Sequence, residues 1–125
     1  MIFDTDIFIW IQRGNYRAAK LVETADERYL SIFSYMELLQ NAKNKKQHKF
    51  TNDFLKSYCF QVLPFTENIG HRSAVYVEEY SLTYGLRAGD ALIAATAVEN
   101  ALTLCTSNKK YFHFIKELDL KFFKP

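Results

Sequence analysis

The chain alternates short apolar runs with longer segments in which apolar residues recur every three or four positions. Short apolar runs predict β-strands, whereas the longer spacing predicts amphipathic helices. Strands are therefore expected at residues 1–3, 29–32, 61–65, 102–105 and 120–123. Helices are expected at 5–13, 16–24, 34–41, 50–58, 66–84, 90–99 and 108–115, and the basic stretch 41–49 is expected to be a solvated helix end or loop.

Short strands that alternate with helices are typical of an α/β fold. We expect a sandwich in which helices cover a short, mostly parallel sheet of four to five strands. The sequence contains no internal repeat, no low-complexity tract and no linker. With 125 residues, the chain is expected to form a single domain over residues 1–125.

The amino-acid composition indicates a folded, globular protein. Apolar residues make up 49% of the chain and aromatic residues 16%, which favours a packed core over disorder. The formal net charge of +2 neither indicates nor excludes a nucleic-acid partner. Cys59 and Cys105 lie among apolar neighbours and are expected to be buried free thiols, as in a reducing cytoplasm. No apolar stretch approaches the roughly 20 residues that span a bilayer, so no membrane association is expected.

Three acidic residues stand in otherwise apolar surroundings. Asp4 follows the first strand, Glu37 lies on the helix after the second strand, and Asp90 begins the helix before the fourth strand. An isolated carboxylate in such a place is costly to desolvate, which suggests a shared purpose. In parallel α/β sheets ligands gather at the carboxyl ends of the strands, where Asp4 and the segment 106–108 are expected. Asp90 joins them only if its helix start leans over the same edge.

Carboxylates that lie close together repel one another, so a proton or a cation is needed to offset their charge. Two unit charges about 4 Å apart repel by about 4 kcal/mol at an effective dielectric constant near 20. Protonation or a bound dication would relieve this repulsion, and oxygen ligands without clustered His or Cys favour Mg²⁺ or Mn²⁺. Such metals promote attack on phosphate esters. Taken singly, Asp4 and Asp6 could be helix N-caps, Glu37 could pair with a basic neighbour, and Asp90 could interact with its helix dipole.

Four motifs in this order resemble those of PIN domains, in particular the VapC-type toxins of type II toxin–antitoxin pairs. The resemblance covers essentially the whole chain and implies a PIN-like α/β/α sandwich. The motifs are Ile2-Phe3-Asp4-Thr5-Asp6-Ile7, Ser34-Tyr-Met-Glu37-Leu, Leu86-Arg-Ala-Gly-Asp90-Ala-Leu-Ile-Ala-Ala and Leu104-Cys-Thr106-Ser-Asn108-Lys-Lys-Tyr-Phe112.

The resemblance implies a Mg²⁺- or Mn²⁺-dependent endoribonuclease. By position, Asp4, Glu37 and Asp90 match the acids that bind the metal, and Asn108 matches a fourth catalytic position that is often Asp. An Asn at this position removes one charge and puts tight binding of a second metal in doubt. The residues expected to support the metal ligands are Asp6, which matches a position often held by Asn, Thr106 and Ser34.

The resemblance also implies partners. The substrate would be structured RNA such as transfer RNA, with phosphate contacts expected from Arg13, Arg87, Lys109 and Lys110. A cognate antitoxin would cover an apolar groove near the acids, and a homodimer and a toxin–antitoxin hetero-oligomer are expected in the cytoplasm. The residues expected to line the groove are Phe8, Trp10, Ile11, Leu38 and Leu39. A non-toxin PIN-like nuclease and a catalytically weak RNA-binding module remain the alternatives.

Overall fold

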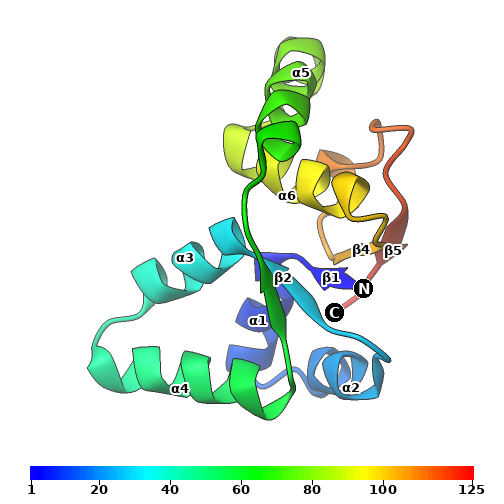
Figure 1. Cartoon of the computed structure of the whole chain (residues 1–125). Helices are drawn as coiled ribbons and strands as arrows, with labels where there is room; N and C mark the ends of the chain where they lie inside the picture. The colour runs from blue at the N-terminus through cyan, green and yellow to red at the C-terminus, as the bar shows by residue number, and fades with distance from the viewer.

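Five short strands form one sheet at the centre of the computed structural model, which describes all 125 residues (Figure 1). Their order across the sheet is β3-β2-β1-β4-β5, and every neighbouring pair is parallel. The prediction of a parallel α/β sheet of four to five strands is thus confirmed. The strands are β1 (Ile2–Phe3), β2 (Tyr29–Ser31), β3 (Gln61–Leu63), β4 (Leu104–Thr106) and β5 (Leu120–Phe122).

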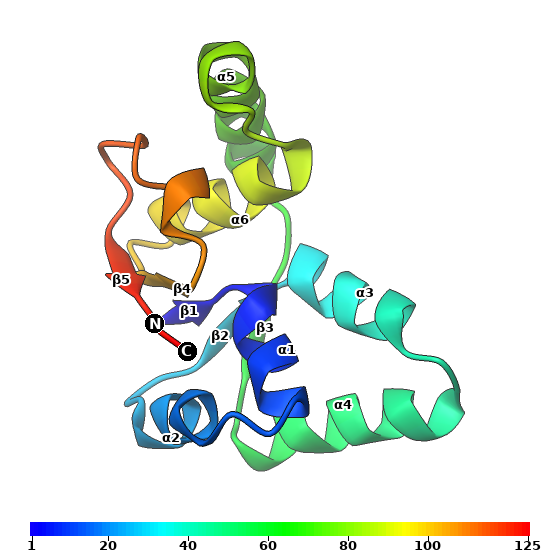
Figure 2. The same ribbon diagram turned by 180° about the vertical axis from the view of Figure 1, so that it is seen from behind.

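Helices cover both faces of this sheet, which confirms the expected sandwich. Helices α5 and α6 lie on one side, whereas α1, α2 and α4 lie on the other, as the two opposite views show (Figures 1 and 2). None of these helices combines the length and apolar character needed to cross a membrane. The elements are α1 (Thr5–Gln12), α2 (Tyr16–Thr24), α3 (Ile32–Asn41), α4 (Lys45–Ser57), α5 (Glu67–Tyr84), α6 (Ala88–Glu99) and a short 3₁₀ helix, η1 (Lys109–Tyr111).

The two faces of the sheet bury separate apolar clusters. Ile2 and Leu104 belong to the cluster under α5 and α6, whereas Phe3 and Cys105 belong to the cluster under α1, α2 and α4. Successive side chains of a strand point to opposite faces. Because both faces are covered, the central strand β1 is a continuous apolar run rather than an alternating pattern.

Two predicted helix starts are wrong because a different residue caps the helix. The helix expected to begin after Ser34 starts at Ile32, since the side chain of Ser31 accepts a hydrogen bond from the Ser34 backbone N–H (3.0 Å). The helix expected to begin at residue 50 starts at Lys45, so of the stretch expected to be a helix end or loop only residues 42–44 are not helical. Asn44 caps α4 by accepting from the Gln47 backbone N–H (2.9 Å).

Three further local predictions need correction. Helix α6 begins at Ala88 rather than at Asp90, so Asp90 lies within its first turn. The helix expected over 108–115 is reduced to the single turn of η1. Cys59 is exposed, because it leaves α4 in the left-handed region (φ 55°), whereas Cys105 is buried as predicted. Both thiols are free.

Candidate active site

The carboxyl ends of β1 and β4 bring Asp4 and Thr106 together. Phe3 pairs with Cys105, and the chain continues directly into Asp4, whose backbone N–H donates to the Cys105 carbonyl (2.9 Å). The Asp4 carboxylate accepts hydrogen bonds from the Thr5 N–H and from Thr106 Oγ1, both at 2.7 Å. Asp4 is only 5% exposed. It therefore acts as the N-cap of α1 and is also tied to the neighbouring strand.

Thr5 connects α1 to Glu37. Its Oγ1 lies 2.7 Å from Glu37 Oε1 and 2.8 Å from Ser34 Oγ. Because a hydroxyl carries one proton, Thr5 donates to the carboxylate while Ser34 donates to Thr5. Ser34 thus supports Glu37 indirectly, and Glu37 makes no ion pair with a basic neighbour. Sequence reasoning missed Thr5, whose only signal was its place between Asp4 and Asp6.

Gly89 allows α6 to pack closely against α3, and this places Asp90 near the other acidic residues. A Cβ atom at Gly89 would lie 2.6 Å from Cζ of Phe33, a distance that requires the ring to move. Glycine thus permits the close approach of the two helices. Burial raises the pKa of Asp90, the nearby charge of Glu37 raises it further, and Arg87 opposes both effects.

The Asp6 side chain holds the loop that follows β4 by hydrogen bonds. Its Oδ2 accepts hydrogen bonds from the Ser107 N–H (2.9 Å), from Ser107 Oγ and from Asn108 Nδ2 (3.1 Å). Ser107 Oγ also accepts from the indole N–H of Trp10 (3.3 Å). The second carboxylate oxygen, Oδ1, is buried without any hydrogen-bond partner. Asp6 is therefore not an N-cap, because its contacts lie in the loop after β4.

One pocket of about 370 Å³ collects most of these side chains. All four predicted catalytic residues line it, together with Asp6 and Arg87. Lys109, Lys110 and Arg13 do not line the pocket, and the Arg13 guanidinium instead lies 5.6 Å from the centre of the Trp10 ring. The lining residues are Asp4, Thr5, Asp6, Ile9, Phe33, Glu37, Asn41, Arg87, Gly89, Asp90, Ile93 and Asn108.

The acids of this pocket are electrostatically frustrated. Burial raises the pKa of Asp4 to about 8, and the neighbouring charge of Asp6 contributes next. Burial also raises the pKa of Asp6. None of Asp4, Asp6, Glu37 and Asp90 takes part in an ion pair. The oxygen donors, the lack of any ion pair to the four acids and the unpartnered Asp6 Oδ1 fit a hard divalent cation.

The carboxylates do not yet form a complete set of metal ligands. In the arrangement shown, no three acidic, His or Cys side chains converge closely enough to hold one ion. Hydrogen bonds from Thr106 and Thr5 hold the carboxylates of Asp4 and Glu37. The structure therefore brings the predicted acids to one pocket, and their joint ligation of a metal stays a prediction.

An apolar groove adjoins the acidic pocket. It has a volume of about 580 Å³, lies between α1, α3 and α4, and shares Ile9 and Asn41 with the pocket. Ile11 and Leu38 line it as predicted, and together with Phe8 they also line a small adjoining cavity. Trp10 and Leu39 do not line it. Helix α4 contributes the aromatic residues Phe50 and Phe54. Sequence reasoning placed both on a helix but did not assign them to the groove, because that depends on how α4 packs against α1 and α3.

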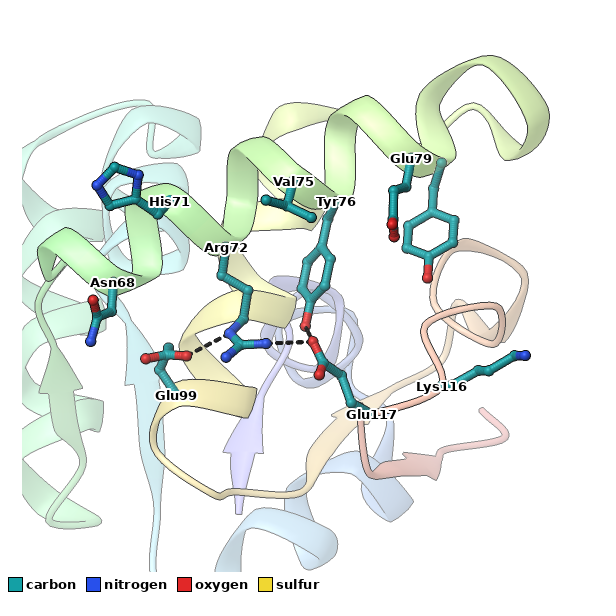
Figure 3. A pocket seen from close by; sticks show the side chains of 10 residues that line it. Asn68, His71, Arg72, Val75, Tyr76, Glu79, Glu99, Lys116 and Glu117 are labelled. Atoms are coloured by element: carbon teal, nitrogen blue, oxygen red, sulfur yellow. Dashed lines mark hydrogen bonds and ion pairs between the residues drawn. The ribbon is translucent and has the colours of Figure 1, made fainter.

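A separate cavity of about 670 Å³ lies beside α5 and contains none of the predicted site residues (Figure 3). Arg72 donates to Glu99 and to Glu117, each at 2.5 Å, and Tyr76 donates its hydroxyl to Glu117. The buried part of this cluster is thus internally paired. It ties the segment before β5 to α5 and α6, which is a structural role.

Comparison with known proteins agrees with this geometry. The sequence matches the PIN domain family over residues 1–117. The chain is similar to a toxin–antitoxin complex from Klebsiella pneumoniae, with 30% identity over 94% of this chain and 93% of that chain and a TM-score of 0.79. It is also similar in fold to VapBC2 from Rickettsia felis bound to a promoter DNA fragment (24% identity, 99% and 100% covered, TM-score 0.77). VapBC-1 from nontypeable Haemophilus influenzae gives 22% identity, 98% coverage of both chains and a TM-score of 0.77.

No curated protein sequence matches the chain closely. The resemblance to VapC-type PIN domains is nevertheless confirmed by the family match and by these solved structures. PIN domains are generally nucleases, so membership indicates a nuclease. From its matched residues and its parallel sandwich, this chain belongs to the PIN domain family.

Proposed function

We propose that this protein is a divalent-metal-dependent endoribonuclease and the toxin of a toxin–antitoxin pair. The observation that carries the proposal is the acidic pocket itself. Four carboxylates and the Asn108 amide reach one pocket at the carboxyl edge of the sheet, and none of the carboxylates is ion-paired. Arg87 is the one basic side chain that lines this pocket beside four carboxylates, and such an excess of negative charge is expected where a bound cation completes the site.

Asp4, Glu37 and Asp90 are the residues that would hold Mg²⁺ or Mn²⁺, directly or through water. When bound, such a metal supplies a more acidic water and offsets charge on the phosphate. Asp4 is preorganised by its two hydrogen bonds, and Glu37 reaches the pocket while bonded to Thr5. Arg87 lines the same pocket and is the basic side chain placed to contact the phosphate. In-line attack by water would leave a 5′-phosphate and a 3′-hydroxyl.

RNA cleavage tests this proposal. Purified protein is incubated with total transfer RNA while Mg²⁺ or Mn²⁺ is titrated, and Asp90→Asn is compared with wild type. Asp26→Asn is the matched control, because Asp26 is exposed and precedes β2, at the opposite edge of the sheet. We expect cleavage to require metal, to be lost in Asp90→Asn and to persist in Asp26→Asn. Cleavage that continues in EDTA, or in Asp90→Asn at the wild-type rate, would contradict the mechanism.

The proposed partner is an antitoxin whose apolar side chains fill the groove beside the pocket. The groove reaches the acids through Ile9 and Asn41, so a basic side chain of the antitoxin could enter the acidic pocket from it. Phe50 is 59% exposed at the groove and offers an apolar contact at its rim. The solved relatives from K. pneumoniae and R. felis are a toxin–antitoxin complex and a DNA-bound VapBC2. A homodimer and a cytoplasmic site of action belong to the same proposal.

A binding experiment tests the proposed partner. The candidate antitoxin is the protein encoded by a small reading frame next to the gene for this chain. Phe50→Glu places a charge on the groove without opening the core, since Phe50 is exposed. We expect it to weaken binding by about tenfold or more, as loss of an aromatic anchor does. Phe122→Glu is the control, because Phe122 is 49% exposed on β5, outside the groove. Equal affinity of both variants would exclude this groove as the docking site.

A further inference from the structure

The Asp6 carboxylate makes more contacts with the loop after β4 than with its own helix neighbours. One oxygen, Oδ2, accepts three hydrogen bonds, two from Ser107 and one from Asn108 Nδ2. Asp6 is not a member of any ion pair. A carboxylate used in this way fixes the position of a loop rather than balancing a charge.

The hydrogen bond from Asn108 to Asp6 fixes the orientation of the Asn108 side-chain amide. An Asn side chain ends in one amide nitrogen, which donates, and one oxygen, which accepts. Because Asp6 Oδ2 holds Nδ2 at 3.1 Å, Oδ1 is the atom that Asn108 can offer to the pocket it lines. The backbone of Asn108 is fixed as well, since its N–H donates to Thr106 Oγ1 (3.0 Å). Thr106 in turn donates to Asp4, so the loop and the acids form one connected unit.

We propose that Asp6 is a positioning residue that acts through Asn108, by holding the amide so that Oδ1 serves as an oxygen donor toward a divalent cation in the pocket. The inference rests on the proposed metal-dependent function. It assigns Asp6 a role in which the hydrogen-bond acceptor matters and the negative charge does not. That distinction separates Asp6→Asn, which keeps an acceptor, from Asp6→Ala, which does not.

Asp6→Asn and Asp6→Ala differ in the property that the proposal requires. The Asn side chain can place its own Oδ1 where Oδ2 of Asp6 lies and still accept from the Ser107 N–H and from Asn108 Nδ2, but it carries no charge. The Ala side chain loses the acceptor together with the charge. Asn108→Ala removes the group through which Asp6 is proposed to act, and Asp26→Asn controls for the loss of one acidic charge from the chain.

The experiment follows binding of Mg²⁺ to the purified protein without RNA. The side-chain amide of Asn108 is observed by NMR, its signal being assigned by its absence in Asn108→Ala, and affinity is measured by calorimetry. Wild type and Asp6→Asn are expected to bind within about threefold of each other and to shift this signal. Asp6→Ala is expected to bind about 10–100-fold more weakly, the usual cost of losing a residue that orients a metal ligand.

Coupling between the two residues completes the test. If Asp6 acts through Asn108, Asp6→Ala combined with Asn108→Ala should bind Mg²⁺ no more weakly than the weaker single variant. Additive losses would overturn the inference, as would Asp6→Asn binding as weakly as Asp6→Ala, because the charge would then be the active property. Asp6→Ala binding like wild type would also overturn it. Absence of Mg²⁺ binding to wild type would instead refute the proposed function, and the inference with it.

Discussion

Removal of the Asp4 charge should stabilise the metal-free protein. Asp4 is 5% exposed, has no cationic partner, and has a pKa raised from 3.8 to about 8 by burial and by Asp6. In Asp4→Asn the amide oxygen can still cap α1 by accepting from the Thr5 N–H, since Asn and Asp are equally good N-caps. The amide nitrogen replaces the oxygen that accepts from Thr106, so Thr106 must become the acceptor.

The magnitude follows from the pKa. Each unit of displacement corresponds to about 1.4 kcal/mol, so keeping Asp4 buried at pH 7 costs the metal-free fold at most about 4 kcal/mol. The reversed hydrogen bond to Thr106 returns about 1 kcal/mol of that gain. A net stabilisation of roughly 1–3 kcal/mol should raise Tm by roughly 4–10 °C in a domain of this size.

The gain should depend on pH in a defined direction. A carboxyl whose pKa is higher in the folded than in the unfolded state binds more protons when folded, so stability falls as pH rises through that interval. The difference in Tm between Asp4→Asn and wild type should therefore be small near pH 4 and largest near pH 8. Calorimetric scans in EDTA measure it, with Asp26→Asn as control. A difference that is independent of pH, or a lower Tm for Asp4→Asn at pH 8, would refute the electrostatic reasoning.

Three further outcomes follow from particular contacts. Gly89→Ala should push Phe33 aside and slow RNA cleavage by about tenfold or more, because small displacements of catalytic groups are costly; unchanged single-turnover rates would show that the approach of α6 to α3 tolerates a methyl group. Arg72→Gln should speed amide hydrogen exchange in the segment around Glu117, and unaltered exchange would argue against the ion network as its anchor. In the native protein a thiol reagent should modify Cys59 rapidly and Cys105 only after unfolding; equal rates would contradict the burial described here.

The fold was predictable because its signals are local. Each strand lies in an apolar stretch, and the central strand β1 is buried on both faces, as Ile2 and Phe3 show by pointing into different clusters. Helix boundaries were harder to predict, because Ser31, Asn44 and other nearby polar residues are chemically equivalent candidates for a cap. Exposure of Cys59 could not be predicted, since it depends on a left-handed backbone conformation at the end of α4.

The site was predictable where strand ends determine it and not where helix packing does. Asp4 and Thr106 meet because adjacent parallel strands end side by side. The contact of Thr5 with Glu37 depends on how α1 packs on α3, and no sequence pattern encodes it. Glycine at position 89, directly before Asp90, was a usable signal for the close helix approach.

The central claim is that Asp4, Glu37 and Asp90 jointly hold a divalent metal. Crystals grown with Mn²⁺, measured at a wavelength where manganese scatters anomalously, test it most directly. The account predicts an anomalous peak about 2–2.5 Å from carboxylate oxygens of Asp4 and Asp90, with Glu37 bound directly or through water. A peak bound elsewhere, or an acidic pocket without a peak at saturating Mn²⁺, would contradict the account.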